Sequence, residues 1–212
     1  MRHENGEPIP SHRTEPPSFA GTLLICDSFR KEAKEYLRQR GYGQVSVETY
    51  PTLCHLAKPM GRVIESHIKG RPDERRHPCV LIGGCGGLPP TTGDLSSVSY
   101  WPRHCVYFLL PRSEIDRRVR EGEYLLSPGW LMHWKQVMDE WGFDEEVARR
   151  FFSESARSLA LLDTGLYATA AEELAAMARF TNLPFTTVPV GVERIFRVFD
   201  KAIAHLQRKA VA

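Results

Sequence analysis

Cysteine and histidine side chains recur in the sequence where short apolar segments end. This set comprises Cys26, His55, Cys85 and Cys105. Thiolate and imidazole are the donors of tetrahedral zinc sites of the Cys₃His type, and they also suit iron, whereas magnesium and calcium prefer oxygen. The sequence therefore predicts a metal site made by these four residues, with zinc as the first choice of metal and iron as the second.

Two other interpretations of the cysteines remain open. Buried free cysteine packs as a small apolar residue, and Cys79, which lies inside an apolar segment, is predicted to do so. Alternatively, Cys85 is a nucleophile that His55 or His104 activates in a metal-free enzyme. Cys54 is the substitute ligand if one member of the predicted set does not bind metal.

Cys85 lies in a glycine-rich segment that is expected to form either a tight turn after a strand or a loop that contacts a ligand. Because glycine has no side chain, Gly84, Gly86 and Gly87 allow a bound molecule to approach the backbone closely. The segment is not a dinucleotide fingerprint, since Pro89 takes the place of the third glycine, and it lacks the Gly-Lys-Ser/Thr ending of a phosphate loop. Trp130 is expected either to form a wall of the ligand site or to pack its helix against the core.

Strands that alternate with helices must position these residues. Short apolar or alternating segments predict strands at 22–26, 45–49, 79–83, 159–163 and 185–190. Helical spacing of apolar residues fills the intervals between most of them and continues to a C-terminal helix with an apolar stripe. This order predicts a three-layer α/β fold, with a mostly parallel sheet flanked by helices, in a single domain over residues 19–212. Ligands of such sheets bind outside the carboxyl ends of the strands, where the cysteines are expected.

Residues 97–110 allow two interpretations. Either 97–101 is a strand and a helix begins near His104, or 106–110 is itself the strand. β propensity favours the second interpretation, because 106–110 is rich in apolar and aromatic residues. Cys105 follows a strand end only under the first interpretation.

Composition and charge narrow the classes of partner. The 212 residues carry 28 basic and 26 acidic side chains, so the near-neutral chain is not expected to bind nucleic acid. No apolar segment reaches the 18 residues typical of a membrane span, and the first residues lack the apolar region of a secretory signal.

Five cysteines at irregular spacings argue against a disulfide framework and for the reducing cytoplasm. Residues 1–18, with four prolines, are predicted to be a disordered tail.

Several short motifs occur in an order that resembles a known family. They are Leu24-Ile25-Cys26, Leu53-Cys54-His55, Gly83-Gly84-Cys85-Gly86, Pro102-Arg103-His104-Cys105, Tyr124 to Trp130, and Leu162-Asp163-Thr164-Gly165. In these motifs the chain resembles the domain-of-unknown-function family 1638 over residues 22 to about 200. His104 stands where that family usually has an aspartate. Any role that the carboxylate has in the family is therefore not expected at this position.

The resemblance also implies a metabolic setting. Members of the family are often encoded near corrinoid-dependent methyltransferases, which implies an accessory role in corrinoid-dependent methyl transfer or one-carbon metabolism. A corrinoid protein or a methyltransferase is then the expected partner. Together with the cysteine pattern, this predicts a cytoplasmic Cys/His metal-binding protein. The alternatives are the metal-free enzyme with a cysteine nucleophile and a non-catalytic domain that binds or senses a small molecule.

Overall fold

The computed structural model describes residues 19–52, 70, 79–83, 98–101 and 104–211. Within these residues, seven strands form two sheets, and every strand pair is parallel. The first sheet has the order β2-β1-β3-β4, with β1 at Gly21–Cys26, β2 at Val45–Tyr50, β3 at Cys79–Ile82 and β4 at Val98–Trp101. The second has the order β5-β6-β7, with β5 at Glu123–Leu126, β6 at Ser158–Asp163 and β7 at Phe185–Pro189. The predicted α/β class with parallel strands and flanking helices is confirmed, and the strands divide between two sheets.

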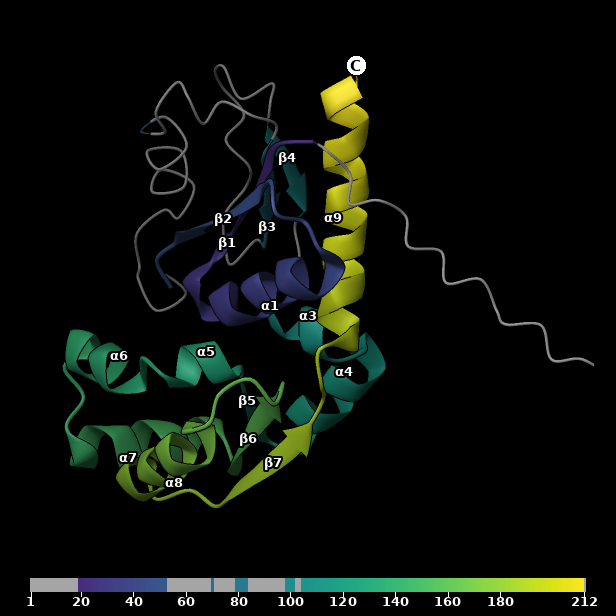
Figure 1. Cartoon of the computed structure of the whole chain (residues 1–212). Coiled ribbons are helices and arrows are strands. Elements are labelled where there is room, and N and C mark those ends of the chain that lie inside the picture. Colours follow the sequence, from purple (N-terminus) through teal and green to yellow (C-terminus); the bar gives the residue numbers. More distant parts are fainter. Residues whose placement is uncertain (1–18, 53–69, 71–78, 84–97, 102–103, 212) are drawn as a thin grey trace, which may run out of the picture.

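Helices connect and cover the strands. Their bounds are η1 Asp27–Phe29, α1 Arg30–Arg40, α3 Val106–Leu109, α4 Arg112–Arg120, α5 Pro128–Leu131, α6 Trp134–Trp141, α7 Glu145–Ser155, α8 Ala170–Thr181 and α9 Glu193–Val211. None of the helices in the described ranges is long and apolar enough to cross a membrane. The first sheet with η1, α1, α3 and α9 is called the first half below, and the second sheet with α5 to α8 is called the second half (Figure 1).

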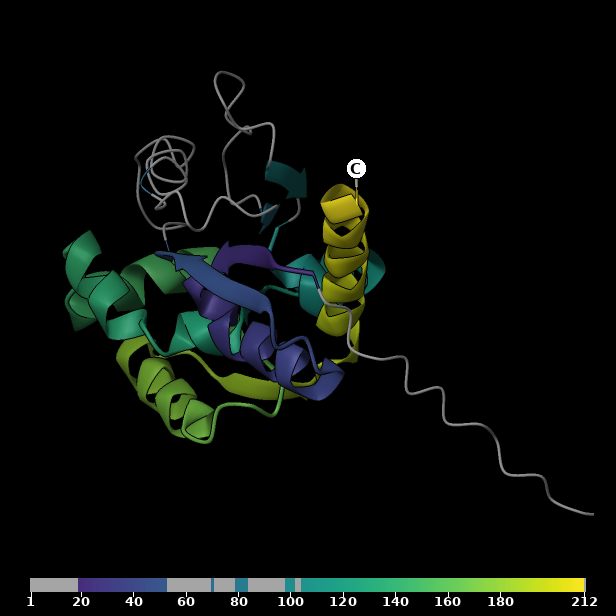
Figure 2. The same ribbon diagram turned by 45° about the horizontal axis from the view of Figure 1, so that its top comes forward.

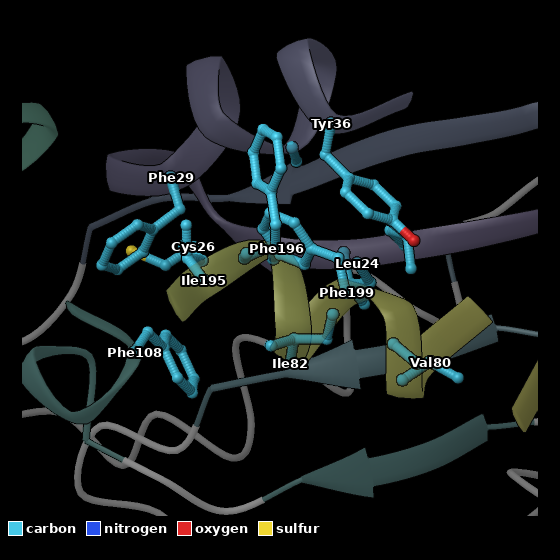
Figure 3. Close-up of a cluster of buried hydrophobic side chains, with 14 of the residues drawn as sticks. Leu24, Cys26, Phe29, Tyr36, Val80, Ile82, Phe108, Ile195, Phe196 and Phe199 are labelled. Carbon is cyan, nitrogen blue, oxygen red and sulfur yellow. The ribbon is translucent and has the colours of Figure 1, made fainter. Parts of the chain in front are cut away.

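The core of the first half lies between its sheet and two helices that pack side by side. All six residues of β1 are buried, as expected for an apolar strand covered on both faces. The ring centroids of Tyr36 on α1 and Phe199 on α9 are 5.3 Å apart. The apolar stripe predicted for the C-terminal helix is confirmed, since Ile195, Phe199 and Leu206 are fully buried. Figure 3 shows these helices meeting the strands around a continuous set of apolar side chains.

The second half has its own core. β6 runs through its centre, with Leu159 and Leu161 buried against helices that include Trp134 and Phe152. Figures 1 and 2 show α9 running along the first half, away from α6, α7 and α8. The chain passes from the first half to the second through α4, and it returns from β7 to α9. The molecule therefore consists of two packed halves that are joined by two chain crossings.

Two segments differ from the interpretation that the sequence favoured. Val106–Leu109 is a single helical turn, and the strand is Val98–Trp101, so the β-propensity preference for 106–110 was wrong. The reason is tertiary: β4 pairs in register with β3, and Phe108 packs edge-on against Phe29, with ring centroids 5.7 Å apart. A short apolar run does not distinguish these outcomes by itself. The strand β5, Glu123–Leu126, was not among the predicted strands.

Candidate functional site: a thiol-lined cavity between the halves

A cavity of about 130 Å³ lies where the two halves meet. The first half contributes residues from the end of β1, from η1 and from the start of α3, and the second half contributes β5 and the start of α5. The lining residues are Cys26, Ser28, Cys105, Val106, Tyr124, Leu125, Leu126, Ser127 and Trp130. None of these lining side chains is ionised in its ordinary state at neutral pH, so the cavity suits soft or neutral groups rather than a free anion.

Two of the predicted metal ligands line this cavity. Cys26 is the last residue of β1 and is 7% exposed, whereas Cys105 immediately precedes α3 and is partly exposed. Both can reach the cavity because β1 and β4 run in the same direction through one parallel sheet, so that the carboxyl ends of these strands lie on the same side. The correct position of the strand at 98–101 is therefore what places Cys105 next to a strand end.

Hydroxyl groups surround the sulfur of Cys26. Its Sγ lies 3.6 Å from Ser28 Oγ and 3.7 Å from Thr52 Oγ1, and these two hydroxyl oxygens are 2.9 Å apart. A hydroxyl can donate a hydrogen bond to a thiolate or accept one from a thiol. Ser28 and Thr52 are not among the predicted site residues, although their positions shortly after the ends of β1 and β2 are a signal that could have indicated them.

Aromatic side chains form the opposite wall. Trp130 is 9% exposed, and its ring centroid lies 6.4 Å from that of Tyr124. Trp130 lines the cavity and also belongs to the core of the second half, so both roles expected for it apply. The wall reaches the first half because Gly129 touches Ser28: an ideal Cβ on Gly129 would lie 1.9 Å from the Ser28 carbonyl oxygen.

A histidine lies near the cavity at the start of α6. His133 Nε2 is 3.7 Å from Asp27 Oδ2, and Asp27 also pairs with Arg30. Asp163, at the end of β6, accepts a hydrogen bond from the Gly165 amide at 2.8 Å and so stabilises its own turn. This carboxylate is therefore a turn-stabilising group in the described structure.

A buried carboxyl group connects the halves behind the cavity. Glu32 on α1 is fully buried, and it receives hydrogen bonds from Thr164 Oγ1 at 2.9 Å and from the Tyr167 hydroxyl at 3.2 Å. Burial raises the pKa of Glu32 above its usual value, and hydrogen bonds from its own backbone amide, from Thr164 and from Tyr167 only partly oppose this effect. The pKa of Tyr167 is also raised, first by burial and then by the neighbouring Glu32 carboxylate.

The remaining predicted residues fall into two groups. Cys79 is fully buried in the first core, as predicted, and His104 is exposed with its ring 6.4 Å from that of Tyr107. The others, His55, Cys54, Cys85, Gly84, Gly86 and Gly87, lie outside the described residues. Among the residues that are described, no cluster of three or more Cys, His, Asp or Glu side chains is arranged to hold a metal ion.

Comparison with known proteins identifies the family. The model of a family described as proteins of unknown function, DUF1638, matches residues 60–198. The chain belongs to the DUF1638 family. This confirms the resemblance found in the motifs; the match includes Cys105 and Trp130 and begins after Cys26 and His55. No curated protein and no solved structure matches the DUF1638 chain.

Proposed function

We propose that this DUF1638 protein binds a thiophilic metal ion, zinc in preference to iron, at the cavity between its halves. The observation that carries the proposal is that Cys26 and Cys105, far apart in the sequence, line one cavity. Two thiolates are half of a tetrahedral site, and His55 and Cys85 are proposed as the other two ligands because of their positions after predicted strands.

The surroundings of Cys26 support a thiolate ligand. The hydroxyls of Ser28 and Thr52 lie within hydrogen-bonding range of its sulfur, and such outer contacts orient a ligand and stabilise its charged form. The apolar walls limit the access of water to the cavity. This favours a soft metal ion that is bound through sulfur over a hard metal ion that keeps its hydration shell. A bound zinc ion would keep the coordinated sulfurs as thiolates, which are nucleophiles toward alkyl groups.

We also propose an accessory role in corrinoid-dependent methyl transfer or one-carbon metabolism, which is the setting that the resemblance of the motifs implies. The proposed partner is a corrinoid protein or a methyltransferase, and the proposed location is the cytoplasm. In this role the thiol cavity would accept or hold a small group that the partner delivers. The reaction chemistry would then depend on Cys26, Cys85 and Cys105 rather than on an ionised acid or base among the residues that line the cavity.

A second candidate function is metal-free binding of a small neutral molecule. The observation that favours it is the cavity itself, with aromatic walls from Tyr124 and Trp130 and no Asp, Glu, Lys, Arg or His among the described residues that line it. Pockets for small molecules are mostly apolar with a few placed polar groups, as here. A metal-free enzyme with Cys85 as nucleophile is the further alternative.

Metal analysis of the purified protein separates these candidates. Protein from zinc-supplemented medium is expected to contain about one zinc per chain, with sulfur-rich tetrahedral coordination in X-ray absorption spectra. Cys26→Ala and Cys105→Ala should each lower the metal content sharply, because each deletes a sulfur that faces the cavity. The folded protein should remain, since each half has its own apolar core.

Cys79→Ala is the matched control. It makes the same chemical change at a cysteine buried in the core, so stability should fall through lost packing while the metal content stays unchanged. A wild-type protein that contains no metal would contradict the proposal. So would full metal content in both the Cys26→Ala and the Cys105→Ala variants.

A further inference from the structure

The buried carboxyl group of Glu32 stands at the junction of the two halves and takes no part in the metal proposal. It lies on α1 of the first half, and the side chains that donate hydrogen bonds to it, Thr164 and Tyr167, lie between β6 and α8 of the second half. The Tyr167 hydroxyl also lies 3.4 Å from the carbonyl oxygen of Ser28, a residue of the cavity. These contacts bridge the halves directly behind the thiol cavity.

The environment of Glu32 favours the neutral acid while the halves are closed. Its side chain is fully buried, and desolvation is the largest influence on its pKa, which it raises. Among the described residues no cation forms an ion pair with it: Lys31, whose charge lowers its pKa slightly, places its Nζ 4.4 Å from the centre of the Tyr167 ring. If the halves parted, water would reach the carboxyl group and this penalty would disappear.

Other titratable groups around the junction act mainly on Tyr167 or on one another. From η1 and β1, Asp27 and Cys26 face Tyr167, and they raise its pKa as Glu32 does. From the start of α6, His133 faces Asp27 at 3.7 Å. Glu32 is therefore the buried acid of the junction, and its neighbours change the strength of the effect rather than its direction.

We propose that Glu32 is a proton-dependent clasp: it keeps its proton while the two halves are closed around the cavity and releases it when they part. When protonated, its carboxyl group can donate to the Tyr167 oxygen, which leaves the Tyr167 hydrogen for the Ser28 carbonyl. Closure is then coupled to the uptake of one proton. Access to the thiol cavity consequently increases with pH, whether or not the cavity holds a metal ion.

The direction of the pH effect follows from linkage. Below the ordinary glutamate pKa of 4.5, Glu32 is protonated in both the closed and the open form, and pH has no influence through it. Above this pH the open form loses its proton first, so opening becomes easier until the pH exceeds the raised pKa of the closed form. Each unit of pKa difference between the two forms corresponds to about a tenfold change in the opening equilibrium.

Hydrogen exchange compared between wild type and Glu32→Gln tests the clasp. Gln keeps the shape and hydrogen-bonding capacity of Glu32 but cannot ionise. At pH 4.5–5 the peptides that contain residues 127–131 and 163–169 should exchange at similar rates in both proteins. As pH rises, wild type should exchange these peptides progressively faster than Glu32→Gln, with both proteins compared at the same pH and metal content. A ratio of rates that does not change with pH would overturn the proposal.

A control variant and a titration complete the test. Glu35→Gln makes the same change one turn along α1, at a partly exposed carboxylate paired with Arg38, and should leave the exchange ratio unchanged. Carbon-13 NMR titration of the wild-type carboxyl groups measures the pKa of Glu32 directly, and it serves also if Glu32→Gln does not fold. A Glu32 that titrates at or below its ordinary pKa would refute the clasp.

Discussion

At the residue scale, the backbone conformation of Gly83 requires a glycine where β3 ends and the glycine-rich segment begins. Gly83 directly follows β3 and has a φ of +111°, a conformation that residues with a side chain rarely adopt. An ideal Cβ at this position would lie 2.8 Å from the Tyr50 hydroxyl, which itself donates to the Ile82 carbonyl oxygen at 3.4 Å. A glycine is therefore required where the chain leaves the sheet toward Cys85.

We expect Gly83→Ala to lower the free energy of unfolding by about 1–3 kcal/mol, because the left-handed backbone becomes strained and buried Tyr50 must shift. Urea denaturation followed by circular dichroism measures the change. Gly43→Ala is the control, since a Cβ there has no atom within 4 Å. An equal effect of the two substitutions would show that the strain at Gly83 is not significant.

Single residues also show where sequence reasoning was sufficient and where it was not. Cys26 and Cys105 could be predicted as site residues because of their side-chain type and their position after a strand. Both features indicate a site at the carboxyl ends of the strands. Glu32 could not, because a glutamate beside Lys31 on a helix is typical of an exposed surface. Its burial depends on Thr164 and Tyr167, which arrive from the other end of the chain and leave no local pattern.

At the scale of elements, α9 stabilises the first half by covering its sheet. The helix packs against β1, β3 and α1, and its apolar face is fully buried (Figure 3). Phe199 lies at the centre of this face, with its ring 5.3 Å from that of Tyr36. Because these residues are contributed by the end of the chain, the first half is complete only when α9 is in place.

Phe199→Ala should therefore destabilise the protein by about 3–5 kcal/mol, the usual cost of deleting a buried aromatic ring. Phe185→Ala makes the same change on β7, where the side chain is 50% exposed, and should cost far less. Thermal unfolding followed by calorimetry compares the two variants. Similar losses of stability would mean that α9 is not the element that completes the first core.

Elements with a strong local pattern could be predicted, whereas those fixed by pairing could not. β1 and α9 follow from an apolar run and a helical stripe. Val106–Leu109 has the composition of a strand, but it forms a helical turn because β4 already occupies the edge of β3. Glu123–Leu126 is a strand of four residues that becomes recognisable through its pairing with β6.

At the scale of the whole molecule, the cavity exists because the two halves pack against each other closely. Each half has its own sheet and apolar core, Leu162 of β6 is buried in the core of the first half, and the cavity takes lining residues from both halves. Gly129 lies directly against Ser28, whose carbonyl oxygen also accepts from the Tyr167 hydroxyl that contacts Glu32. The geometry of the thiol cavity therefore depends on the distance between the halves as well as on the cysteines themselves.

Gly129→Ala tests this dependence, because two effects of the substitution oppose each other. Alanine is favoured over glycine within a helix such as α5 by about 1 kcal/mol, so helix propensity alone predicts a more stable protein. Packing predicts the opposite: the new Cβ would lie 1.9 Å from the Ser28 carbonyl oxygen, a backbone atom that cannot rotate away. α5 must therefore move away from η1, at a cost of about 1–3 kcal/mol.

We expect the packing effect to dominate in Gly129→Ala. Compared with Gly43→Ala, this variant should be less stable in urea, exchange hydrogen faster at 127–131 and show faster alkylation of Cys26. Unchanged exchange and alkylation together with higher stability would mean that the close contact between the halves does not control access to the cavity.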